Sequence, residues 1–195
     1  MNSKNLNRRQ LIVAATGLGL GSLIPTSAAQ EPQLINPNDA GNIHGETLKA
    51  ISSRLGNELK IDTEKGMLVI LELLVEKGVV GKEEAPILEN LIHALFDPSK
   101  DPDKLRKNIE QLWSKERERL SNVAVAIFSI ARQSVNSAEK YASDHPRQIA
   151  IVSSDVLGAI TGALACAAGG PIVAVLCVVA GSVAKSATTA FETRH

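Results

Sequence analysis

The sequence predicts an all-α protein, a bundle of about five to six helices with an apolar helical hairpin at its centre or C-terminal end. Apolar residues recur at spacings of three and four residues through most of the chain, as they do on one face of a helix. The alternation of period two that is typical of strands is absent. Small residues recur at helical spacing in the C-terminal quarter. With 44% hydrophobic residues, the composition is that of an ordinary globular protein.

The first helix is expected over about residues 46–59, after a segment rich in Pro, Asn, Asp and Gly at residues 30–45 that reads as a linker. One apolar stripe defines this helix. It consists of Leu48, Ile51, Leu55 and Leu59.

The second and third helices are bounded by recognisable capping residues. Thr63 can accept a hydrogen bond from a backbone N–H at the start of a helix over residues 63–77, and Gly78 can end it. The third helix is expected over residues 83–96. Pro86 falls in its first turn, where the missing N–H of proline costs little.

A fourth, long helix is predicted from about residue 102 to 142, with the charged sequence SKERERL as its solvated middle. Asp144 can cap a fifth helix that ends near residue 168. The sequence Gly169-Gly170-Pro171 breaks that helix, and a sixth is expected over residues 172–190. The amphipathic region thus covers residues 46–143, and an apolar hairpin covers residues 144–195.

Residues 1–29 have the three parts of a secretory signal peptide. A basic start is followed by an apolar segment over residues 11–24 and by small residues that favour cleavage after Ala29. An uncleaved anchor is the alternative. It is disfavoured because the apolar segment would form a helix of about 21 Å, short of the ~30 Å hydrocarbon core of a bilayer.

The sequence NRRQLI resembles the twin-arginine export motif. Arg8 and Arg9 match the motif, Leu11 stands where Phe is usual, and Asn7 and Ile12 depart from it. The resemblance implies an exported protein, periplasmic or extracellular, that crosses the membrane already folded. The general secretory route remains the alternative.

Charge and aromatic content exclude one class of partner. The chain has no net charge, and residues 1–29 contain three basic residues and no acid. Residues 30–195 therefore keep 18 of the 21 basic residues against all 21 acidic ones, about −3 in total. With aromatic residues at only 3% and no basic excess, a nucleic-acid partner is not expected.

The C-terminal hairpin carries no charged residue between Val156 and Ala184. Small residues recur there every four positions, an arrangement that lets two helix backbones approach closely. Each glycine costs about 1 kcal/mol of helix propensity relative to alanine, which predicts a close neighbour at that face. The residues expected to shape this packing are Gly158, Gly162, Gly169, Gly170 and Pro171.

Residues 146–190 resemble the Ala/Gly-rich hairpins of pore-forming colicins and the Gly/Ala-rich tails of bacteriocin precursors. The resemblance lies in composition and implies an action on a membrane. Each uncharged arm, with about 13 residues, reaches only about 20 Å. A hairpin that forms the core of a soluble bundle, wrapped by the amphipathic helices, therefore remains the alternative.

Cys166 and Cys177 are the only cysteines in the chain. Around a turn near residue 171 they lie at matching depths on the two arms. Because an exported protein meets an oxidising compartment, we hypothesise a disulfide between them. Two small buried thiols are the alternative.

No catalytic, cofactor or metal site is predicted. Glu89 and His93 share a helix face at a spacing that metal sites use, but without further ligands a surface ion pair is expected. The run Ser153-Ser154-Asp155 lacks a context for nucleophilic catalysis. No phosphate-binding or dinucleotide-binding fingerprint occurs.

These observations lead to one functional expectation and one alternative. The expectation is an exported, non-enzymatic protein that acts at or near a membrane, of the bacteriocin-like or pore-forming type. The alternative is a soluble periplasmic helical bundle that binds a protein or a small apolar ligand. The sequence also leaves open a further class, an enzyme whose site is scattered over several helices. The sequence leaves the oligomeric state and the target open.

Overall fold

The computed structural model describes residues 45, 49–51, 53–55 and 60–192. The signal-peptide features at Arg8, Arg9 and Ala29 and nearly all of the predicted linker lie outside these residues. The predicted helix over residues 46–59 is described only at residues 49–51 and 53–55, which are helical.

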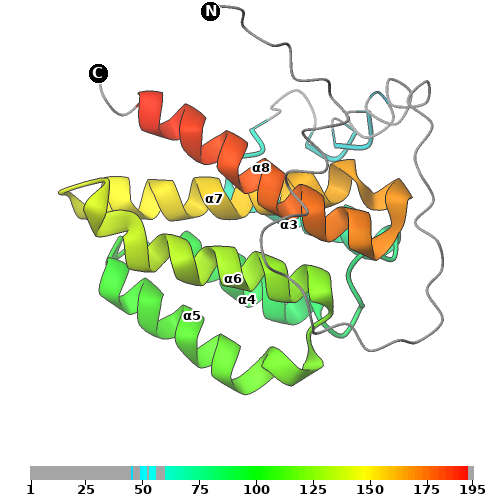
Figure 1. The fold of residues 1–195 in the computed structure, drawn as a ribbon, viewed down its shortest axis with the longest axis horizontal. Coiled ribbons are helices and arrows are strands. Elements are labelled where there is room, and N and C mark those ends of the chain that lie inside the picture. The colour runs from blue at the N-terminus through cyan, green and yellow to red at the C-terminus, as the bar shows by residue number, and fades with distance from the viewer. Residues whose placement is uncertain (1–44, 46–48, 52, 56–59, 193–195) are drawn as a thin grey trace, which may run out of the picture. The chain divides into compact units, whose positions relative to one another are not determined.

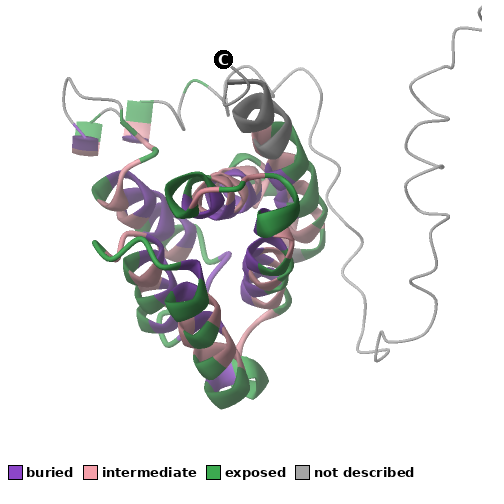
Figure 2. Ribbon diagram, turned by 90° about the vertical axis from the view of Figure 1, so that its left-hand side faces the viewer, coloured by how far each residue is buried: buried purple, intermediate pink, exposed green. Residues whose placement is uncertain are grey.

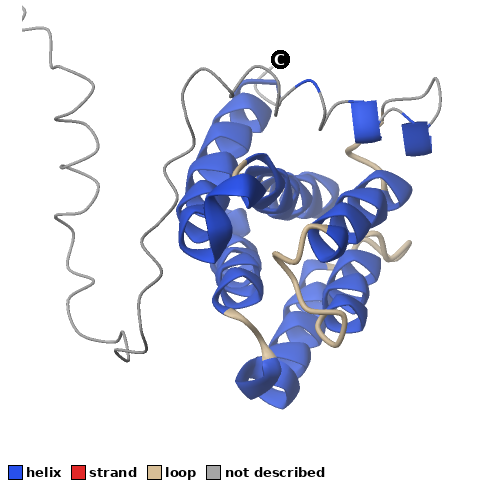
Figure 3. Ribbon diagram, turned by 90° about the vertical axis from the view of Figure 1, so that its right-hand side faces the viewer, coloured by secondary structure: helices blue, strands red, loops and turns tan. Residues whose placement is uncertain are grey.

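Within the described residues the fold is all-α, as the sequence predicts, and no strand occurs there (Figure 3). Six α-helices follow one another between Glu64 and Glu192 (Figure 1). They are α3 (Glu64–Glu76), α4 (Ala85–Leu95), α5 (Pro102–Glu116), α6 (Asn122–Ser137), α7 (His145–Ala165) and α8 (Gly170–Glu192). Three short 3-10 turns lie between the last four helices: η2 (Arg117–Arg119), η3 (Ala138–Lys140) and η4 (Ala167–Gly169).

The predicted capping residues lie where the sequence places them. The side chain of Thr63 accepts a hydrogen bond from the Gly66 N–H at 3.1 Å at the start of α3. Gly78, with φ +68°, follows its end. Asp144 accepts from the Arg147 N–H at 3.0 Å and so caps α7. These local signals hold because they satisfy backbone N–H groups that a helix end leaves without partners.

The single long helix predicted over residues 102–142 is wrong. The chain turns at Leu120, whose backbone is extended, and Ser121 caps a new helix, α6. The Ser121 N–H also donates to the Glu84 carboxylate, which holds the break in place from a distant segment. The prediction that residues 114–120 are solvated is wrong in part. Glu116 is buried and accepts a hydrogen bond from Arg119 Nη1 at 2.8 Å.

Helix α7 lies at the centre of the packing and contacts α3, α6 and α8. Its buried residues belong to the same apolar core as those of the preceding helices, and the buried sides face inward (Figure 2). The largest fully buried side chains include Phe128, Ile70, Leu91 and Leu157. The apolar hairpin and the amphipathic helices therefore share one core.

Candidate functional site

The turn between α7 and α8 is built from small residues. Helix α7 ends at Ala165, three residues earlier than the sequence predicts, and η4 leads into α8. Gly170 has φ +80°, a conformation that side-chain-bearing residues rarely adopt. A Cβ added to Gly169 would lie 2.9 Å from the Cβ of Val173. Pro171 is the second residue of α8, where proline's missing N–H costs little.

The two arms approach at backbone contact distance through glycine. A Cβ added to Gly162 would lie closer to the Cys177 carbonyl oxygen than the Cβ atoms of real residues come to other atoms. One added to Gly158 would meet the Gly181 carbonyl oxygen in the same way, and one added to Gly181 would meet that of Gly158. Sequence reasoning identified Gly158 and Gly162 but missed Gly181. Gly181 could have been identified from its position four residues after Cys177, which continues the row of small residues along α8.

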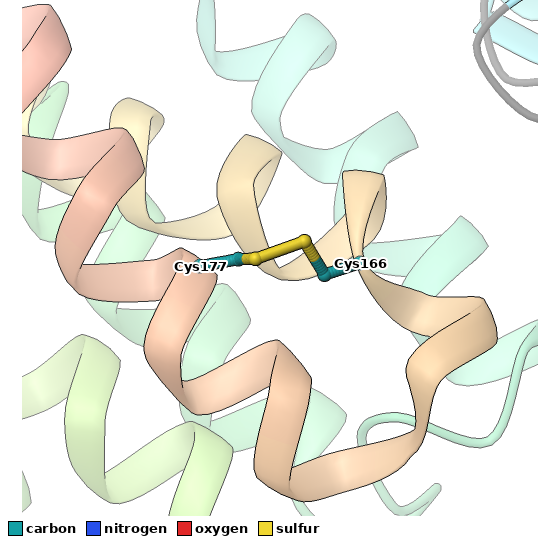
Figure 4. The surroundings of a disulfide bond; sticks show 2 residues. All are labelled: Cys166 and Cys177. Atoms are coloured by element: carbon teal, nitrogen blue, oxygen red, sulfur yellow. A yellow bond between two sulfur atoms is a disulfide. The ribbon is translucent and has the colours of Figure 1, made fainter. Parts of the chain in front are cut away.

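A disulfide joins Cys166, at the end of α7, to Cys177 on α8 (Figure 4). The two Cα atoms are 6.2 Å apart, and the cysteines are separated by 11 positions in the sequence. The bond closes the turn end of the hairpin, while the glycines hold the arms together further along. The hairpin is thus fixed as one unit.

Replacing both cysteines with serine is expected to lower the free energy of unfolding by about 3 kcal/mol, because the short cross-linked loop restricts the unfolded chain. Urea denaturation of the oxidised protein and the double variant measures this difference. Reduced wild type serves as the control and should match the variant. An intact mass that does not rise by two hydrogens on reduction would contradict the bond.

Within the described residues, α7 is the one helix long and apolar enough to cross a membrane, by length and composition. The most apolar window of α7 is 56% buried inside the protein. Asp155 is the acidic residue within this helix, and it accepts a hydrogen bond from Ser134 Oγ of α6 at 2.5 Å. In the folded protein α7 is therefore a core helix anchored to its neighbour.

Helix α8 exposes a stripe of aliphatic side chains, here called the α8 stripe. Its members are Ile172, Leu176, Val179 and Val183, with exposed fractions of 63%, 61%, 53% and 65%. Spacings of four, three and four residues place them on one face of the helix. The opposite face, with Ala174 and Val178, is buried against the bundle. The other exposed residues between 172 and 184 are alanines, so this face carries no charge.

The histidine that the sequence pairs with Glu89 has a different acidic partner in the structure. His93 Nδ1 lies 2.5 Å from Oε1 of Glu64, so the ion pair of this histidine joins α4 to α3 and does not involve the predicted partner Glu89. No cluster of three metal-ligating side chains occurs in the described part of the chain.

The geometry thus provides a cross-linked, glycine-packed hairpin with one arm in the core and one arm presenting an uncharged face. Such an arrangement can bind an apolar surface without unfolding, because the exposed side chains already point outward. No family model, no curated protein and no solved structure matches this chain. The functional conclusion therefore depends on the hairpin itself.

Proposed function

We propose that this chain is an exported, non-enzymatic protein of the bacteriocin-like or pore-forming type that acts at a lipid membrane, with the α8 stripe as the surface that contacts lipid. The observation that supports this proposal is the stripe itself: four large aliphatic side chains, each more than half exposed, on one uncharged helix face. Exposed apolar side chains that are grouped in one patch mark an interaction surface, since their contact with water is unfavourable.

Lipid is the occupant that best fits the chemistry of this stripe. Protein interfaces rely on aromatic and arginine side chains as anchors, and the stripe has neither. Residues 30–195 carry about −3, so electrostatic attraction to anionic lipid is not the driving force. Apolar burial in a zwitterionic bilayer surface requires no such attraction.

The hairpin divides the action into two steps. In the first step, α8 lies in the membrane–water interface. Helix α7 stays in the protein core, because the Asp155–Ser134 hydrogen bond and its own buried face hold it there. In the second, α7 would have to leave α6 and α3 to enter the bilayer. Its 21 residues reach about 31 Å, enough to cross the hydrocarbon core.

Phosphatidylcholine vesicles test the first step by co-sedimentation with the purified chain. Replacing Leu176 and Val183 with glutamate removes two lipid-buried side chains, a loss of about 3 kcal/mol. The affinity for vesicles is therefore expected to fall about a hundredfold. Tyr141→Glu is the matched control, because Tyr141 is 74% exposed but lies outside the stripe. The control should bind like the wild type.

Dye release from the same vesicles tests the second step. The apolar segment at residues 11–24 can also contact lipid, but it is the same in all variants. A difference between variants in dye release therefore reports on α8. Binding without release would contradict the pore-forming type while keeping the lipid contact. Equal binding by the Leu176→Glu, Val183→Glu double variant would overturn the assignment of the stripe. Failure of the wild type to bind vesicles would favour the alternative, a soluble bundle that binds a protein or a small apolar ligand.

A further inference from the structure

We propose that a cleft beside α7 binds a small amphipathic carboxylate, such as a medium-chain fatty acid, with its tail against an apolar floor and its head between Lys100 and Lys185. The cleft has a volume of about 300 Å³, at the lower end of the range for small-molecule sites. None of the residues that line it belongs to the α8 stripe, and the proposal does not depend on membrane binding.

The floor of the cleft consists of core side chains. Met67, Ile149 and Leu157 line it, and their exposed fractions are only 1%, 3% and 2%. The half-buried ring of Phe96 forms one wall. An alkyl chain in this position would contact apolar atoms that are already shielded from most water, which is how small apolar groups are bound in preformed pockets.

Two lysines from distant parts of the chain line the same cleft. Lys100 follows α4 and Lys185 belongs to α8. Neither lysine forms an ion pair with another described residue. Asp62 is the acidic side chain in the lining, so the rim carries one net positive charge. A single carboxylate would balance this charge and could accept hydrogen bonds from both ammonium groups.

The structure positions each lysine by a specific local feature. Lys100 has φ +49°, a left-handed conformation that is uncommon for residues other than glycine. The turn before it is held by Asp97, whose pKa the Lys104 ammonium and Ser99 keep well below its usual range. Lys100 Nζ lies 5.8 Å from the centroid of the Phe96 ring. The carboxylate site is thus adjacent to the apolar wall.

Gly158 makes room for the second lysine. A Cβ added to Gly158 would lie 2.9 Å from the Cβ of Lys185. The absence of a side chain at Gly158 therefore lets the stem of Lys185 cross α7 toward the cleft. A short polar residue, Ser153, and the exposed Ala150 complete the mouth on α7.

Titration calorimetry of the full chain with decanoate, below its aggregation concentration, tests the proposal. Lys100→Gln and Lys185→Gln are each expected to raise the Kd about tenfold, because each removes a charge-assisted hydrogen bond. Lys140→Gln, at an exposed lysine outside the cleft, should leave the Kd unchanged. Decanol, which lacks the charge, and acetate, which lacks the tail, should each bind about tenfold or more weakly.

Two further variants separate the cleft from the α8 stripe. Ala150→Phe places a ring in the cleft mouth from an exposed position and should abolish decanoate binding. Leu176→Glu should leave it unchanged. Circular dichroism of each variant establishes that the fold is intact. Undetectable decanoate binding by the wild type, decanol binding as strong as decanoate binding, or undiminished binding by the folded Ala150→Phe variant would overturn the proposal.

Discussion

Replacing Gly162 with leucine is expected to lower the free energy of unfolding by about 3 kcal/mol or more, the largest effect of any single substitution proposed for this chain. A Cβ at this position would meet the Cys177 carbonyl oxygen, and it would lie 2.8 Å from the carbonyl carbon and 3.3 Å from the Cα of Gly181. All of these atoms belong to backbone. They cannot move aside as the end of a flexible side chain can, so α7 and α8 must separate.

Chemical denaturation followed by circular dichroism measures this loss. Ala165→Leu is the matched control, because it adds the same side chain at an exposed position of the same helix. The control should change the free energy of unfolding by no more than about 0.5 kcal/mol. Unfolding of Gly162→Leu at the wild-type denaturant concentration would show that the two helices do not touch at this residue.

Replacing Glu84 with alanine is expected to cost about 3 kcal/mol of unfolding free energy. The side chain is 3% exposed, and its carboxylate accepts hydrogen bonds from the N–H of Gly81, at 2.6 Å, and from that of Ser121. Its removal leaves two backbone donors without partners, and each unpaired buried group costs roughly 1–3 kcal/mol. The substitution also removes the hydrogen bond to Ser121 that fixes the chain reversal between α5 and α6.

Two other variants make this prediction specific. Glu84→Gln keeps one acceptor oxygen and should lose about half as much stability. Glu83→Ala removes an exposed neighbouring carboxylate and should lose no more than about 0.5 kcal/mol. If Glu84→Ala and Glu83→Ala unfold at the same denaturant concentration, the bridge from Glu84 to Ser121 does not stabilise the fold.

Helix positions could be read from the sequence wherever the deciding contacts are local. Thr63, Gly78 and Asp144 act on backbone groups within a few residues, so their roles follow from the order of the chain. The break at Ser121 could not be read in this way. The apolar stripe continues across it, and its second stabilising partner, Glu84, is 37 positions away.

The sequence identified the glycines on only one side of the hairpin interface. The sequence pointed to Gly158 and Gly162, because a repeated loss of helix propensity predicts a close neighbour. It did not identify Gly181, the residue opposite them on α8. The register between two arms depends on how many residues the turn takes, and the first arm ends three residues earlier than expected.

The candidate sites depend still more on tertiary packing. Lys100 and Lys185 are far apart in the sequence and have no shared motif, so no pattern could place them at one cleft. Both arms of the hairpin are similarly apolar. Only their packing shows that α7 is surrounded by the other helices, chiefly α8, α6 and α3, whereas α8 leaves the α8 stripe exposed.

The sequence by itself therefore determined the all-α class, the helix ends that local caps define, and the uncharged, small-residue character of the C-terminal hairpin. These properties follow from backbone hydrogen bonding and from helical spacing, which act over a few residues. The tertiary structure alone decided the reversal at Ser121, the partner of the glycine face and the side of α8 that meets solvent. These three features depend on burial. All the helices pack around the same core, and their packing together decides which apolar faces are covered.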